Sequence, residues 1–112
     1  MAVTLQHAIG LQQAGRLTEA ENAYKAILAA EPMSPKTHFH LAMLLWVQGR
    51  TSEALASCER AVSLRPDFVE AHTARGNLLL GLGRFDDAPV AFEKVMALDP
   101  ENSDAYRGRG YV

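Results

Sequence analysis

Histidine and cysteine are the residues of this chain that could carry out chemistry, as metal ligands or as nucleophiles. The sequence contains four histidines, His7, His38, His40 and His72, and one cysteine, Cys58. A histidine-based zinc site on a helix places two histidines at i and i+4, close to further nitrogen, sulfur or carboxylate ligands. No pair here has that spacing, and a single cysteine excludes an intramolecular disulfide and a cysteine-based zinc site. We therefore expect packing histidines, no metal, no cofactor and no enzyme activity.

The elements that position these residues are set by a repeat of 34 residues. Four residue types return at that interval: Gly15, Gly49 and Gly83; Arg16, Arg50 and Arg84; Ala20, Ala54 and Ala88; Pro32, Pro66 and Pro100. A period in this range indicates a stack of similar supersecondary units rather than one irregular globule.

Within each unit the pattern predicts two helices joined by a short turn. The glycine ends the first helix, because glycine adopts the left-handed conformation without a steric cost. The proline ends the second helix, because it disfavours a helical residue before it. We expect Thr18, Ser52 and Asp86 to cap the second helices, while Pro89 fits the first turn of its helix.

Small residues should allow the two helices of each unit to approach closely, since interior packing leaves few voids. The expected facing sets are Ala8 with Ala20 and Tyr24, Ala42 with Ala54 and Cys58, and Gly76 with Ala88 and Phe92.

These positions resemble the tetratricopeptide repeat family, in which small, apolar, glycine, alanine, aromatic and proline residues recur at set places. The matching residues are Ala8, Leu11, Gly15, Ala20, Tyr24, Ile27 and Pro32; Ala42, Leu45, Gly49, Ala54, Cys58, Ala61 and Pro66; and Gly76, Leu79, Gly83, Ala88, Phe92, Val95 and Pro100. The first-turn tryptophan of the family is replaced by Thr4, His38 and His72. The resemblance implies an all-α fold, an α-α superhelix or solenoid of three helix-turn-helix repeats at 1–34, 35–68 and 69–102.

Residues 103–112 resemble the beginning of a fourth repeat and predict a partial seventh helix. We expect the chain to be a fragment of a longer array; the alternative is a capping helix. An open terminal repeat would leave an apolar edge that drives self-association.

The helix expected around residues 36–48 is apolar on two sides, so one of them is available to a partner. In the resembling family the corresponding side of each first helix lines a concave groove. By position the groove residues are Leu5, Ile9, Phe39, Met43, Trp46, Val47, Thr73, Asn77 and Leu80, flanked by Gln12, Gln13, Lys36 and Glu70 and extended by Asp104, Arg107 and Tyr111. Trp46 has the character of a hot-spot anchor. The alternative is that Phe39 and Met43 are ordinary packing between repeats.

Some members of that family hold the C-terminal carboxylate of a chaperone with lysine, asparagine and arginine side chains. The matching positions here are Leu5, Ile9, His40, Glu70 and Ala74. They supply no lysine or arginine, and Glu70 would repel a carboxylate. The resemblance therefore does not extend to this mode of binding.

The charge of the chain limits its partners. Its 112 residues have a net charge of −2, so no broad attraction to nucleic acid or to an anionic membrane is expected. The N-terminus has no signal-peptide pattern, and a cytoplasmic location is expected. Three functions remain: a module that binds a partner peptide or helix, the N-terminal array of a larger enzyme similar to O-GlcNAc transferase, and a self-assembling scaffold.

Overall fold

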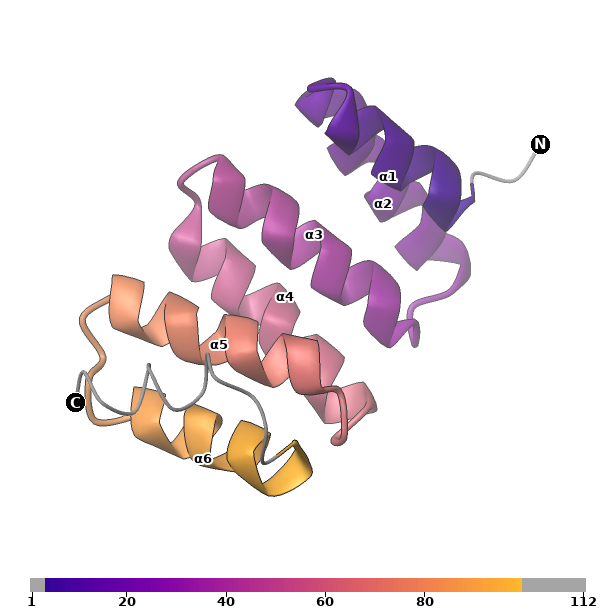
Figure 1. Cartoon of the computed structure of the whole chain (residues 1–112). Coiled ribbons are helices and arrows are strands. Elements are labelled where there is room, and N and C mark those ends of the chain that lie inside the picture. The colour runs from indigo at the N-terminus through magenta and orange to yellow at the C-terminus, as the bar shows by residue number, and fades with distance from the viewer. Residues whose placement is uncertain (1–3, 100–112) are drawn as a thin grey trace.

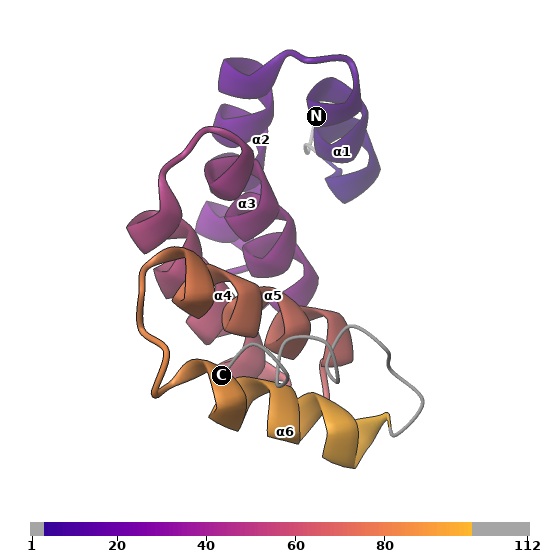
Figure 2. The same ribbon diagram turned by 60° about the vertical axis from the view of Figure 1, so that its left-hand side comes forward.

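The computed structural model describes residues 4–99, and these fold into α-helices with no strand among them. The helices are α1 (Leu5–Gln13), α2 (Leu17–Ala30), α3 (Pro35–Val47), α4 (Thr51–Leu64), α5 (Val69–Gly81) and α6 (Ala88–Leu98). They form three hairpins, α1–α2, α3–α4 and α5–α6, that stack in chain order (Figures 1 and 2). The expected all-α stack of helical hairpins is therefore confirmed. Pro100 and the helix expected over 103–112 lie outside the described residues.

The turn inside each hairpin has the geometry that its glycine predicts. Gly15, Gly49 and Gly83 have φ angles of 80°, 77° and 75°. In the second hairpin the Gly49 N–H bonds to the Trp46 carbonyl and the Arg50 N–H to the Leu45 carbonyl, each at 2.9 Å. The other two turns repeat both bonds. This is the Schellman arrangement, which satisfies carbonyls at a helix end and closes the turn in few residues.

The capping prediction for the second helix of each hairpin is wrong. α2 and α4 begin at Leu17 and Thr51, so Thr18 and Ser52 already lie inside the helices. The Schellman turn is complete at the arginine, and the helix starts with the next residue. Asp86 precedes the N-cap residue of α6, and neither α2, α4 nor α6 has a side-chain cap.

Each of these helices instead begins with an ion pair to the repeated arginine. Arg16 lies 3.0 Å from Glu19, and Arg84 lies 2.8 Å from Asp87, both at i and i+3. Arg50 pairs with Glu53 in the same way. A carboxylate in the first turn also suits the positive end of the helix dipole.

α6 begins later than its counterparts because of Pro89. A helix starting at Phe85 would place the ring of Pro89 against the Phe85 carbonyl. Proline has no N–H to donate to that carbonyl, and its ring would clash with it. The helix starts at Ala88, so Pro89 lies in its first turn, as expected. Phe85 remains in the turn and is 55% exposed.

The core runs through the hairpins along their small residues. Ala8, Ala20, Ala42, Ala54 and Ala88 are fully buried. A Cβ atom at Gly76 would lie 2.6 Å from the ring of Phe92, so the expected contact between these two is confirmed. The Sγ of Cys58 donates to the Ala71 carbonyl at 3.0 Å, and burial raises the pKa of that thiol to about 12. Cys58 is thus a packing residue that links α4 to α5.

The histidines at equivalent positions have equivalent structural roles. The Nε2 atom of His38 lies 3.0 Å from the Pro32 carbonyl oxygen, and that of His72 lies 2.7 Å from the Pro66 carbonyl oxygen. Each bond ties the first turn of α3 or α5 to the loop before it. Within residues 4–99 no group of histidine, cysteine and acidic side chains is placed to hold a metal ion. Among the same residues, no helix has the length and apolar character needed to cross a bilayer.

Candidate partner-binding face

The first helices of the hairpins form one continuous side of the molecule. α3 contacts both α1 and α5, whereas within residues 4–99 the second helices α2, α4 and α6 make no contact with one another. The stack is therefore more closely packed along α1, α3 and α5, which lie in front of α2 and α4 in Figure 1. We call the residues predicted there the inner face: Leu5, Ile9, Phe39, Met43, Trp46, Val47, Thr73, Asn77 and Leu80.

Exposure varies along the inner face. Trp46 and Val47, in the last turn of α3, are 37% and 71% exposed. The other members are half-buried, and the apolar ones among them also pack against the core. The second apolar side of α3 is thus partly open to solvent and partly used to hold the stack together.

Phe39 shows why part of this side is covered. Its ring lies 5.1 Å from the ring of Phe68, which precedes α5, and 5.4 Å from the imidazole of His40. His40 in turn stacks on Tyr24 of α2, with ring centroids 6.3 Å apart. This row of rings joins the three hairpins. One side of the Phe39 ring is therefore used in packing between repeats, as the alternative interpretation expects.

Several polar side chains along α1, α3 and α5 already have hydrogen-bond partners. The Tyr24 hydroxyl donates to the Oε1 of Gln12 at 2.6 Å, and burial raises the pKa of Tyr24 to about 12. The Thr73 hydroxyl donates to the Val69 carbonyl at 3.1 Å. Asn77 is half-buried, and its amide has no hydrogen-bond partner within residues 4–99. The hydrogen-bonding groups of Asn77 are therefore not used within the described part of the chain.

The charge on this side is small. α1 contains no lysine, arginine, aspartate or glutamate. Lys36 and Glu70 occupy equivalent positions on α3 and α5, are exposed, and form no ion pair in the described part of the chain. Arg75 lies 3.5 Å from Glu59 of α4 and so belongs to the junction of α4 with α5. Burial and the nearby charge of Lys36 lower the pKa of His40, which favours its neutral form.

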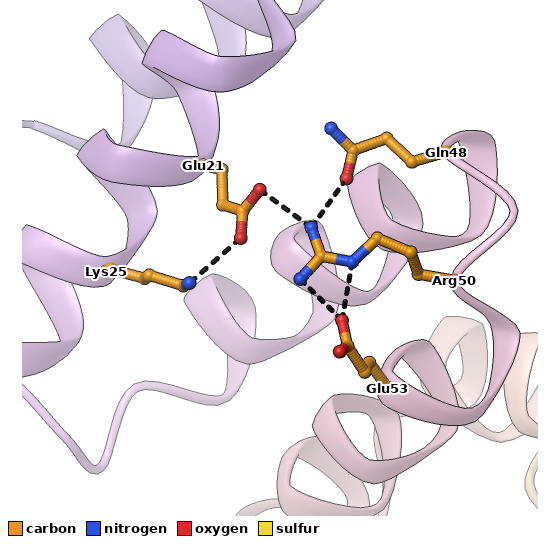
Figure 3. A network of polar contacts seen from close by, with 5 residues as sticks. All are labelled: Glu21, Lys25, Gln48, Arg50 and Glu53. Carbon is orange, nitrogen blue, oxygen red and sulfur yellow. Dashed lines mark hydrogen bonds and ion pairs between the residues drawn. The ribbon is translucent and has the colours of Figure 1, made fainter.

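A polar network between the first two hairpins was not predicted from the sequence. Arg50 lies between Glu21 of α2 and Glu53 of α4, with Nη1 2.9 Å from Glu21 and 3.1 Å from the Gln48 amide oxygen (Figure 3). Lys25 completes it at 2.9 Å from Glu21. Hydrogen bonds from Lys25 and Arg50 lower the pKa of the Glu21 carboxyl. The 34-residue recurrence of the arginine was the available signal, but its partner Glu21 does not recur.

Three residues expected to extend the groove, Asp104, Arg107 and Tyr111, lie outside the described residues. The other predicted members all lie on α1, α3 and α5, and their role in binding stays a prediction.

Comparison of the sequence with family models gives one match, to a model described as tetratricopeptide repeat, over residues 5–67 and 73–112. The chain belongs to the tetratricopeptide repeat family. A comparison with curated proteins gives no match.

Solved structures with this tetratricopeptide fold are closely superimposable on the chain. The first such domain of Spaghetti (RPAP3), bound to the HSP90 peptide SRMEEVD, has a TM-score of 0.88 at 23% identity, covering 95% of this chain and 86% of the other. The second domain of human RPAP3, in complex with the HSP70 peptide SGPTIEEVD, has a TM-score of 0.88 at 24% identity, and the match covers 95% of this chain and 88% of the other. MamA has a TM-score of 0.91 at 20% identity, and the match covers 96% of this chain and 63% of the other. At these identities the likeness shows the fold.

Proposed function

We propose that this tetratricopeptide repeat chain is a non-catalytic protein-interaction module that binds a partner peptide or helix on its inner face. The observation that supports this most is the second apolar side of α3, where Trp46 and Val47 remain exposed beside the half-buried Met43. Large apolar side chains held on a rigid helix contribute binding area at little cost in conformational entropy. The core does not require these two residues to be apolar.

Peptide binding by similar folds supports the class of partner. Two of the similar structures contain a bound chaperone peptide, SRMEEVD in one and SGPTIEEVD in the other. Each of those peptides ends in EEVD, in which three of the four residues are acidic. This chain has no lysine or arginine at the positions that the family uses for such tails, Leu5, Ile9, His40, Glu70 and Ala74. We therefore propose a peptide or helix partner other than an acidic chaperone tail.

Trp46 is the residue through which the proposal is tested. Peptide ligands are first selected from an unbiased display library on the full chain, and their affinity for Trp46→Ala is then measured by fluorescence anisotropy. Truncating a central aromatic anchor should weaken binding by at least about 1 kcal/mol, or roughly fivefold, without loss of helicity.

Val90→Ala is the matched control, because Val90 is 60% exposed but lies on α6, away from the inner face. Its affinity should equal that of the unmodified chain. Ligands that bind Trp46→Ala as tightly as the unmodified protein would place the binding site elsewhere and end the proposal.

Self-association is a second candidate, because α6 leaves Val90 60% and Leu98 36% exposed. An exposed apolar side of a helix can pair with the same side of another molecule. Light scattering over a concentration series tests this candidate. A monomer at every concentration would exclude it and leave the first proposal intact.

A further inference from the structure

The inner face has almost no charge with which to pair a charged ligand. Within residues 4–99 its flanking charges are Lys36 and Glu70, of opposite sign and at equivalent positions on neighbouring helices. Both lie in the first turns of their helices, and the apolar side chains of α3 and Leu80 of α5 follow further along these helices. A charged group buried there would lose its hydration without gaining an opposite charge, which is costly. The contacting side of a partner should therefore be apolar and uncharged.

The inner face also offers few groups for the backbone of a bound segment. An extended peptide has unpaired N–H and C=O groups, and those that are buried must find hydrogen-bond partners. The Thr73 hydroxyl and the amide oxygen of Gln12 are already bonded within the chain, so the half-buried groups that remain on this side are the amide nitrogen of Gln12, the imidazole of His40 and the amide of Asn77. An α-helix pairs its backbone groups internally and needs no such partners.

The second apolar side of α3, which is partly open to solvent, has the spacing of a helix-packing ridge. Phe39, Met43 and Trp46 follow one another at i, i+4 and i+7, so they lie along one side of α3. Rows of this kind pack into the grooves between side chains of a second helix. A partner helix would meet them with apolar residues at i, i+3, i+4 and i+7.

Together these features point to the kind of partner, given that the inner face is the binding site of the proposed function. We infer that the bound segment is an amphipathic α-helix whose contacting side is apolar and uncharged, and that it needs no free carboxylate terminus.

Three synthetic peptides test this with the full chain. The first is a capped peptide of about 18 residues, or about five helical turns. Along its length leucine occupies positions spaced i, i+3, i+4 and i+7, so that the leucines share one side of the helix, and glutamine occupies the others. The second has the same composition with leucine at alternate positions, which favours an extended strand. The third is SRMEEVD, the peptide bound in one related structure. Trp46, the one tryptophan of the chain, reports occupancy by its fluorescence.

The helical peptide should change the Trp46 emission saturably with a Kd below about 1 mM and become helical by circular dichroism as it binds. Because no ion pairs are involved, its Kd should change less than about twofold between roughly 0.05 and 0.5 M salt. The other two peptides should bind at least about tenfold more weakly.

Val47→Lys and Val90→Lys form a matched pair, since both valines are exposed but only Val47 lies on the inner face. Val47→Lys should weaken binding of the helical peptide at least about fivefold, because a lysine there would have to be desolvated. Val90→Lys should leave the Kd of that peptide unchanged. Equal weakening by both variants would contradict the inference.

The outcomes separate this inference from the proposed function. Tighter binding of the alternating peptide or of SRMEEVD, or a tenfold loss of affinity in salt, overturns the inference while the inner face remains a binding site. Absence of any Trp46 response to the helical peptide also overturns it. If, in addition, selected ligands bind Trp46→Ala normally, the proposed function fails as well.

Discussion

Among single residues, Gly76 sets how closely the two helices of the third hairpin can approach. A Cβ atom at this position would lie 2.6 Å from the Cζ atom of Phe92, and Phe92 is fully buried. The ring therefore has no room to move away. Gly10 of α1 is also a helical glycine, but an added Cβ there would meet no atom within 4 Å.

Gly76→Ala should lower the free energy of unfolding by roughly 1–3 kcal/mol, because overpacking outweighs the gain in helix propensity. Gly10→Ala, the matched control, should raise it by about 0.5–1 kcal/mol, because the propensity gain meets no clash. Urea denaturation followed by circular dichroism measures both. A Gly76→Ala variant as stable as the unmodified chain would show that the hairpin can open to admit the methyl group.

The sequence predicts some of these residues well and others poorly, for a physical reason. Glycines and alanines at fixed intervals report a backbone geometry or a close approach, and Gly49 and Gly76 behave as expected. Ser52 looks like a helix cap because an acidic residue follows it, yet capping depends on where the preceding turn ends. That turn is complete at Arg50, so the helix begins before Ser52.

Among the helices, the two junctions between hairpins differ although the hairpins resemble each other. At the first junction the half-buried Glu21 of α2 forms ion pairs with Arg50 and Lys25 (Figure 3). The equivalent residue of α4 is Leu55, which is buried. At this position one junction therefore has an ionic contact and the other an apolar one, although the second junction has the ion pair of Arg75 with Glu59 elsewhere. The period of the sequence cannot predict this difference, because the difference is a departure from the period.

Glu21→Gln should lower the free energy of unfolding by about 0.5–1 kcal/mol in dilute buffer, since it removes the charge that Lys25 and Arg50 share. The difference should shrink in about 1 M salt, where ion pairs are screened. Chemical denaturation at both salt concentrations provides the measurement. Glu93→Gln is the matched control, because Glu93 is exposed on α6 and has no ion pair within residues 4–99, and it should have little effect. Equal losses in the two variants would contradict a role for the network.

For the whole molecule, two histidines that packing shields from solvent connect stability to pH. Burial lowers the pKa of both His40 and His72 below the ordinary value of 6.5, so the folded chain favours their neutral forms. Below about pH 6.5 the unfolded chain binds more protons than the folded one. The stability associated with these groups is therefore complete above that pH and is lost as the pH falls through their folded pKa values.

The urea midpoint should accordingly fall between about pH 7.5 and pH 5.5, before the carboxylates begin to titrate. His40→Phe keeps a ring between Tyr24 and Phe39 but cannot be protonated, so its midpoint should fall less over the same range. A midpoint that does not change with pH, or an undiminished fall in His40→Phe, would argue against this origin.

The arrangement of the molecule is largely predictable from the sequence, whereas the area open to a partner is not. The 34-residue period is sufficient for the hairpins and their order, and for the helices that carry Trp46 and its neighbours. How much of Phe39 remains exposed depends on Phe68, which comes from the next hairpin. Exposure on such a stack is a property of neighbouring units together, so one unit's pattern cannot give it.

The unlike junctions imply a mechanical order of events if the protein is held by its two ends. Tension along the stack passes through both junctions in series, so the weaker one parts first. Both junctions have a partly exposed ion pair, Glu21 with Arg50 and Glu59 with Arg75. The α4–α5 junction has in addition the buried Leu55 in the place of Glu21, together with the buried Cys58 and Phe68. Under load, α1–α2 should peel away as one rupture event, and added electrolyte should lower the force at which it does so.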